Sequence, residues 1–291
     1  MKHDGLPDME PAAPSPARLG EVWLRVVSAV ALAVISFGLA WAGVLPFAVL
    51  VLVIALVISW EWTAVVRGPG LDLCLIVQGL AVIAAVALAS FGFAALGVAV
   101  LIIGAIIVLA LEFGSHPVLS ASGVLYAGLP AVALLWLRSS EPSGFAAVLF
   151  IVTVVAATDT AAFVSGRLIG GPRLAPSISP NKTWSGLIGG VVAATAVATL
   201  FAKWVGSPAA GLALTGALMG VVAQGGDLAE SALKRAFNVK DASQLLPGHG
   251  GFMDRMDGLV CVAVAAALLV LFLDPQAPAG ALLAGLGSPA P

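Results

Sequence analysis

The chain has little charge. Asp, Glu, Lys and Arg together make up only 10% of its 291 residues, whereas 60% of the residues are hydrophobic. The mean hydropathy of +1.10 is far above that of water-soluble domains. This composition argues against a separate soluble domain, and we expect no nucleic-acid partner. It favours a polytopic helical membrane protein.

Cysteine is scarce, and the common motifs of zinc and hydrolase sites are missing. The two cysteines, Cys74 and Cys261, both lie in apolar segments, where a cysteine usually serves as a small buried hydrophobic residue. The sequence has neither a CxxC pair nor a cysteine and histidine spacing typical of zinc. It also lacks a nucleophile elbow and an HExxH motif. These absences exclude the usual zinc and serine-hydrolase chemistries.

Long apolar runs dominate the chain. A membrane-spanning helix needs about 20 mostly apolar residues. The strand-like alternation of a barrel is absent, so we expect an all-α membrane protein with about nine transmembrane helices and a cytoplasm-facing polar active site. The expected spans are roughly 24–42, 44–61, 73–91, 93–111, 118–137, 144–163, 186–205, 209–229 and 258–273.

The spans and the polar segments between them predict a domain organisation. No internal repeat is visible, which counts against an inverted-repeat transporter. We expect a flexible polar segment over 1–22, N-terminal transmembrane helices over 23–142, a catalytic transmembrane region over 143–274 with cytoplasmic loops 164–185 and 231–257, and a short tail over 275–291.

The basic residues are distributed unevenly over the two sides of the expected bundle. With nine spans, 11 of the 13 basic residues share the side of the N-terminus, and only Arg138 and Lys203 lie on the other. The positive-inside rule therefore places the N-terminus and the polar loops on the cytoplasmic side of the membrane. We expect the protein in the inner (plasma) membrane. The 11 are Lys2, Arg18, Arg25, Arg67, Arg167, Arg173, Lys182, Lys234, Arg235, Lys240 and Arg255.

Charge is concentrated in residues 227–257, which hold nine of the chain's 28 charged residues. Asp227 and Glu230 are three positions apart and share one helical face, and Asp254 and Asp257 repeat this spacing. Two close carboxylate pairs repel each other unless a cation lies between them. Oxygen ligands of this kind suit Mg²⁺, so the segment predicts a metal site. Charge at a membrane is costly and usually marks function.

A simpler explanation is that some of these charges only stabilise helix ends. Asp254 and Asp257 would then cap the last span, with salt bridges to nearby basic residues such as Lys234 and Arg255. Capping explains one acid more easily than four.

A second polar segment, residues 159–186, precedes the seventh span. Pro180 suits the start of a helix, and Ser179 is expected to cap it. A helix N-terminus beside Lys182 and Thr183 would form a phosphate site, although the segment lacks the Walker A spacing. An ordinary basic loop followed by a capped helix is the alternative.

His249 lies among glycines, in the run PGHGG. A lone histidine is more often structural than catalytic, and this one has no partner at zinc spacing. The neighbouring Gly250 and Gly251 are more informative, because glycines allow backbone N–H groups to approach an anion.

The segment SALKRAFNVKDASQLLPGHGGFMDRMD, Ser231–Asp257, resembles the signature of the phosphatidate cytidylyltransferases, or CDP-diacylglycerol synthases. It meets every fixed position of that long pattern. The preceding Gly226–Ser231 is similar to the family's GDLxES, and Ser179–Trp184 is similar to its SPxKTW. Specific motifs cover about a third of the chain, and the first 140 residues match in hydropathy only.

The chain departs from the family pattern at two places. After Asp159 the family usually has DxGAY, whereas this chain reads DTAAF and ends on Phe163. Ser185 stands where Glu or Gln is common, and we assign it no role. Asp159 itself matches and remains a candidate.

The resemblance implies the reaction CTP + phosphatidate → CDP-diacylglycerol + pyrophosphate, assisted by Mg²⁺, with a second cation left open. The implied metal ligands are Asp227, Asp254, Asp257, Glu230 and Asp159. The implied catalytic residues are Asp227, Asp254, Lys182 and Asp257. The implied substrate-binding residues are Ser179, Lys182, Thr183, Lys234, Arg235, Lys240, His249, Gly250, Gly251 and Arg255.

The expected partners are CTP, phosphatidate and the lipid bilayer, and a homodimer is left open on family grounds. Whether the basic residues bind triphosphate, the lipid phosphate or anionic headgroups also stays open. Three other functions are alternatives. A cation-coupled transporter would place its acids near mid-bilayer. A related phosphotransferase would use another lipid acceptor. A non-catalytic scaffold would have no need of the intact acidic and lysine positions.

Overall fold

The computed structural model describes residues 33–114, 116–243, 245 and 250–287. Within them, eight helices are long and apolar enough to cross a membrane, and a shorter apolar helix covers Ala33–Ala42. The expected helical, polytopic architecture is confirmed. The long helices are α2 (Val44–Val66), α3 (Leu73–Ser90), α4 (Ala94–Leu111), α5 (Pro117–Arg138), α6 (Gly144–Leu168), α7 (Trp184–Val205), α8 (Ala209–Ala236) and α9 (Met253–Leu273).

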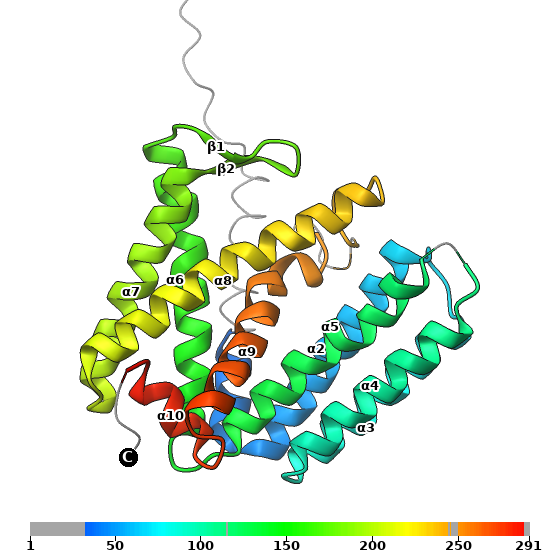
Figure 1. The fold of residues 1–291 in the computed structure, drawn as a ribbon, viewed down its shortest axis with the longest axis horizontal. Helices are drawn as coiled ribbons and strands as arrows, with labels where there is room; N and C mark the ends of the chain where they lie inside the picture. The colour runs from blue at the N-terminus through cyan, green and yellow to red at the C-terminus, as the bar shows by residue number, and fades with distance from the viewer. Residues whose placement is uncertain (1–32, 115, 244, 246–249, 288–291) are drawn as a thin grey trace, which may run out of the picture.

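The helices form two packed groups that meet along α9 (Figure 1). Helices α2 to α5 pack on one another, and α6 to α8 form the second group. Helix α9 packs against α8 on one side and against α5 and α2 on the other. The last spanning helix therefore joins the first half of the chain to the second.

Helices α8 and α9 cross closely at Gly226. A Cβ atom at this position would lie 2.8 Å from the carbonyl oxygen of Asp257 and 2.8 Å from Sγ of Cys261. Only glycine allows the two backbones to approach this far. The close crossing places Asp227, the next residue of α8, beside the first turns of α9.

The polar segments differ from the expected loops in two ways. Helix α8 continues to Ala236 and α9 begins at Met253, so the loop between them is shorter than 231–257. Residues after α6 form an antiparallel hairpin of β1 (Arg173–Ala175) and β2 (Ser179–Thr183), which lies over the ends of α6 and α7 (Figure 1). Neither strand was expected.

The hairpin corrects the predicted start of α7. Ser179 lies in strand β2 and is not the helix cap. Thr183 is the N-cap, and its hydroxyl accepts a hydrogen bond from the backbone N–H of Gly186 at 3.1 Å. The strand pairing of Arg173 with Thr183 keeps the segment extended up to Thr183, so the helix begins four residues later than Ser179 would allow.

The expected C-terminal tail contains one further helix, α10 (Pro278–Ala284). It packs against α9, α6 and α8 at the end of the bundle away from the hairpin (Figure 1). Its Leu282 is fully buried, so this part of the tail belongs to the packed structure.

The crossing at Gly226 can be tested by Gly226→Ala. The added methyl group would meet the backbone of α9, and overpacking of this kind costs about 1–3 kcal/mol of unfolding free energy. We expect a lower thermal midpoint for purified protein in detergent. Gly225→Ala is the matched control, because a Cβ there meets nothing within 4 Å. Equal midpoints for the two variants would contradict the close crossing.

Candidate active site

A pocket of about 920 Å³ lies between the C-terminal ends of α6 and α8, the N-terminal end of α9 and the β-hairpin. It collects residues from three separate polar segments of the chain. Of the 15 site residues expected from the sequence, 10 line it: Asp159, Ser179, Lys182, Thr183, Asp227, Glu230, Lys234, Asp254, Arg255 and Asp257.

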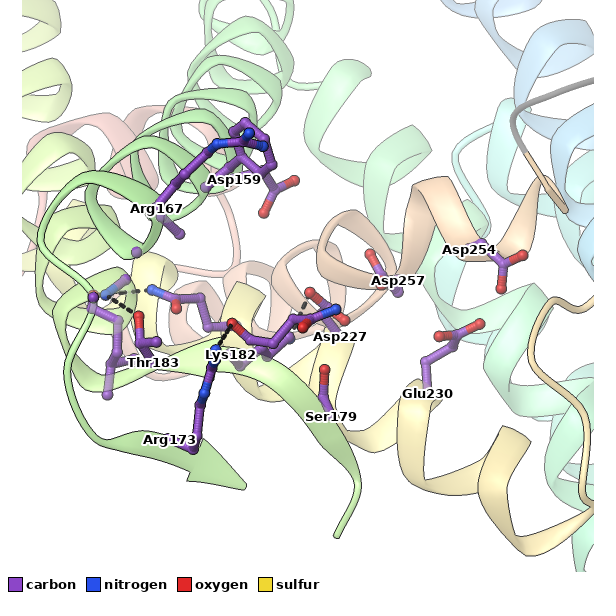
Figure 2. Close-up of a pocket in the computed structure, with 18 of the residues that line it drawn as sticks. Asp159, Arg167, Arg173, Ser179, Lys182, Thr183, Asp227, Glu230, Asp254 and Asp257 are labelled. Atoms are coloured by element: carbon purple, nitrogen blue, oxygen red, sulfur yellow. Dashed lines mark hydrogen bonds and ion pairs between the residues drawn. The ribbon is translucent and has the colours of Figure 1, made fainter. Parts of the chain in front are cut away.

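Three aspartates from three helices face one part of the pocket (Figure 2). They are Asp159 of α6, Asp227 of α8 and Asp257 of α9. Nζ of Lys182, from β2, lies 2.5 Å from Oδ2 of Asp227. In the described part of the structure Asp159 has no hydrogen bond or ion pair. This group of acids is therefore only partly compensated by the protein's own cations.

A second group of charges lies where α8 meets α9. Nζ of Lys234 lies 2.7 Å from Oε2 of Glu230 and 2.7 Å from Oδ1 of Asp254, so one ammonium joins two carboxylates. The Glu230 side chain is 1% exposed, and its Oε1 has no hydrogen-bond partner in the structure. A buried carboxylate of this kind depends on its cation, and removing either partner is strongly destabilising.

The loop before α9 is folded onto Asp254. Oδ2 of Asp254 accepts hydrogen bonds from the backbone N–H of Gly251 at 2.8 Å and of Ala242 at 3.1 Å. Gly250 has a φ of +81°, a conformation that glycine tolerates best. The Gly251 N–H thus serves a carboxylate of the protein rather than an outside anion. His249 lies outside the described residues.

Three predicted substrate-binding residues either contact other parts of the protein or lie outside the pocket lining. The Thr183 hydroxyl is used in capping α7, and its residue is buried. Arg235 donates to the carbonyl oxygen of Ile178 at 3.4 Å, which links the end of α8 to the hairpin. Neither Arg235 nor Lys240 lines the pocket. Their expected contact with substrate stays a prediction.

Two arginines of the pocket were not singled out by sequence analysis. Arg167, in the last turn of α6, and Arg173, in β1, both line it (Figure 2). Nη1 of Arg173 donates to the carbonyl oxygen of Asn181 at 3.3 Å. Arg167 and Arg173 lie on either side of the Gly170–Gly171 pair. This glycine turn between two arginines is the sequence feature that could have identified them as site residues. With them the pocket holds five acidic and five basic residues.

The donor types suit Mg²⁺, although no cage is preformed. Among the described residues, no three Asp, Glu, His or Cys side chains form a cluster that could hold a metal ion as it stands. Mg²⁺ needs only one or two carboxylates when water and phosphate oxygens complete its shell. The oxygens of Asp159 and the unpaired Oε1 of Glu230 are donors of this kind.

Comparison with known proteins agrees with the resemblance seen in the motifs. The chain is 41% identical over 267 residues to the phosphatidate cytidylyltransferase of Brucella suis biovar 1 (strain 1330), which covers 87% of this chain and 95% of that protein. It is 38% identical over 140 residues to the phosphatidate cytidylyltransferase of Bacillus subtilis (strain 168), which covers 47% of this chain and 52% of that protein. Residues 23–273 match the cytidylyltransferase family, and the chain therefore belongs to it.

Proposed function

We propose that this chain transfers the cytidylyl group of CTP to phosphatidate and releases pyrophosphate. The observation that carries the proposal is the pocket, in which acidic and basic residues of the family motifs meet at one end of three spanning helices. The name of its relatives in Brucella and Bacillus supports the same reaction.

The reaction requires little proton transfer but much control of charge. A phosphate oxygen of phosphatidate forms a bond to the α-phosphorus of CTP, and the bond from that phosphorus to the pyrophosphate oxygen breaks. The attacking phosphate monoester has a second pKa of about 6 and is already anionic near neutral pH. It needs no strong general base. The site must instead bring two anions together in line.

Bound Mg²⁺ would neutralise phosphate charge during this transfer. We propose that Asp227, Asp254 and Asp257 hold it, with Asp159 and Glu230 completing the set. Among the residues that the structure describes, Asp257 accepts a hydrogen bond only from the adjacent Gly258 N–H, at 2.6 Å, so its carboxylate keeps capacity for a metal. A second cation is a further proposal, because the carboxylates fall into two groups.

The basic residues of the pocket would bind the phosphates. Lys182 lies against Asp227 and can turn its ammonium toward an entering triphosphate. We propose that Arg167 and Arg173 contact the same group from the α6 end and the hairpin, and that Lys234 and Arg255 act near α9. Guanidinium groups suit phosphate because they donate two parallel hydrogen bonds.

The site's position agrees with the solubility of the two substrates. The pocket end carries eight described basic residues, and the opposite end carries Arg138 and Lys203. By the positive-inside rule we propose that the pocket faces the cytoplasm, where CTP is found, in the inner (plasma) membrane. Phosphatidate would keep its acyl chains in the bilayer. The eight are Arg67, Arg167, Arg173, Lys182, Lys234, Arg235, Lys240 and Arg255.

The acidic residues can be tested by Asp227→Asn and Asp254→Asn. Purified protein with Mg²⁺, labelled CTP and phosphatidate should form a labelled CDP-lipid, and each variant should lose at least about 100-fold in kcat. Asp274→Asn is the control, because Asp274 follows the far end of α9 and accepts hydrogen bonds from the backbone N–H groups of Gln276 and Ala277. Near-normal turnover in either pocket variant would refute the metal assignment. Product with another lipid phosphate but none with phosphatidate would refute the substrate.

The role of the hairpin can be tested by Arg173→Ala. Loss of a charged hydrogen bond to phosphate costs about 1.5–3 kcal/mol, so kcat/KM for CTP should fall on the order of tenfold or more. Lys203→Ala removes a positive charge at the opposite end of the bundle and should leave kcat/KM unchanged. An Arg173 variant with the kinetics of the Lys203 variant would exclude Arg173 from substrate binding.

A further inference from the structure

Glu61 is a fully buried carboxylate in α2, and its role is not explained by any motif of the chain. It lies one turn before the end of this otherwise apolar helix. Burying a carboxylate is costly unless hydrogen bonds or charges compensate for the lost water. The partners of Glu61 should therefore show why it is there.

Within the described part of the chain, the hydrogen-bond partners of Glu61 all belong to the loop before α9 and to the start of that helix. Its Oε1 accepts from the backbone N–H of Phe252 at 2.8 Å and from Oγ of Ser243 at 2.5 Å. Its Oε2 accepts from the backbone N–H of Met253 at 2.5 Å. These residues are 182 to 192 positions away in the sequence.

Glu61 supplies the cap that α9 lacks in its own sequence. Phe252 is the N-cap residue of α9 and makes no side-chain cap hydrogen bond. The first N–H groups of a helix have no partner within the helix, and the helix dipole favours a negative charge beside them. A carboxylate from α2 satisfies both requirements.

Asp254 holds the same piece of backbone. Asp254 follows Met253 directly, and its Oδ2 accepts from the N–H groups of Gly251 and Ala242. The two glycines lie close to the two acids, because a Cβ atom at Gly251 would be 3.0 Å from Oε1 of Glu61 and one at Gly250 would be 3.1 Å from Oδ2 of Asp254. Both carboxylates therefore hold the same short loop.

We infer that Glu61 is a positioning residue for cytidylyl transfer. By holding the first turn of α9 and Ser243, it sets the direction in which Asp254 enters the pocket and meets Lys234. The inference rests on the proposed function for the reaction, whereas the ordering of the loop can be measured without it. It also gives the N-terminal helices a part in the site.

The test uses Glu61→Gln in the full-length protein. The amide has nearly the same shape, but its NH₂ group cannot accept, so one of the two α9 N–H groups loses its partner. We expect kcat to fall at least tenfold and the Mg²⁺ concentration for half-maximal activity to rise at least threefold. Hydrogen–deuterium exchange should be at least tenfold faster for the amides of Gly251, Phe252 and Met253.

Two further variants separate positioning from a general loss of stability. Glu61→Asp keeps the charge but shortens the side chain, and it should restore part of the kcat lost in the glutamine variant. Ser243→Ala removes only one of the three hydrogen bonds, so it should shift the same quantities in the same direction by less. It also serves as the test if the Glu61 variants do not fold.

Glu112→Gln is the matched control. Glu112 is also a largely buried glutamate, with a side chain 14% exposed, but its partners are Arg67, Gly114 and Ser120. None of them belongs to α9 or to the loop before it. This variant should keep the wild-type kcat, Mg²⁺ dependence and exchange at 251–253.

The outcomes distinguish the two proposals. Wild-type protein that makes no CDP-lipid would overturn the proposed function, while the exchange measurement would still test the loop. Faster exchange in Glu61→Gln with wild-type kcat and Mg²⁺ dependence would show a purely structural contact and overturn the positioning role. Unchanged exchange together with unchanged kinetics would overturn the inference entirely.

Discussion

A carboxylate buried at the edge of a membrane is costly unless cations or N–H groups compensate it, and the architecture of this site depends on that requirement. Two of the ion pairs in the pocket join parts of the chain that are distant in sequence. Lys182 brings the hairpin to Asp227 of α8, and Lys234 brings α8 to Asp254 of α9. The contacts that compensate these charges therefore also hold the hairpin, α8 and α9 together.

Features set by local sequence could be predicted, and features set by tertiary contact could not. Spans follow from apolar runs, and the eight described helices lie within a few residues of the expected limits, except that α2, α6 and α8 end later and α9 begins earlier than expected. The three-residue spacing within each pair, Asp227 with Glu230 and Asp254 with Asp257, predicted two acids on one face of each helix, and all four line the pocket. Glu61 was missed because its partners are 182 to 192 residues away, and nothing in an apolar run identifies them.

The β-hairpin shows the same limit at shorter range. Ser179, Pro180 and the residues that follow have the composition of a helix start, and local propensity favoured one. Pairing with Arg173 to Ala175 imposes an extended chain instead, and the capping role passes to Thr183. The hairpin also brings Arg173 to the pocket wall, which no residue pattern within Ser179–Thr183 could indicate. Pairing with β1, which lies outside Ser179–Thr183, determines both the start of α7 and the position of Arg173.

The contact between Glu61 and the start of α9 has a consequence for biogenesis. Glu61 leaves the ribosome about 190 residues before the N–H groups that compensate it. Contacts at such separation form slowly and late, because most of the chain must be made and inserted first. The first half of the bundle is therefore inserted into the membrane before the hydrogen-bond partners of Glu61 have been synthesised. The pocket is completed only when α9 arrives, because Asp254 and Asp257 of this helix are part of its lining.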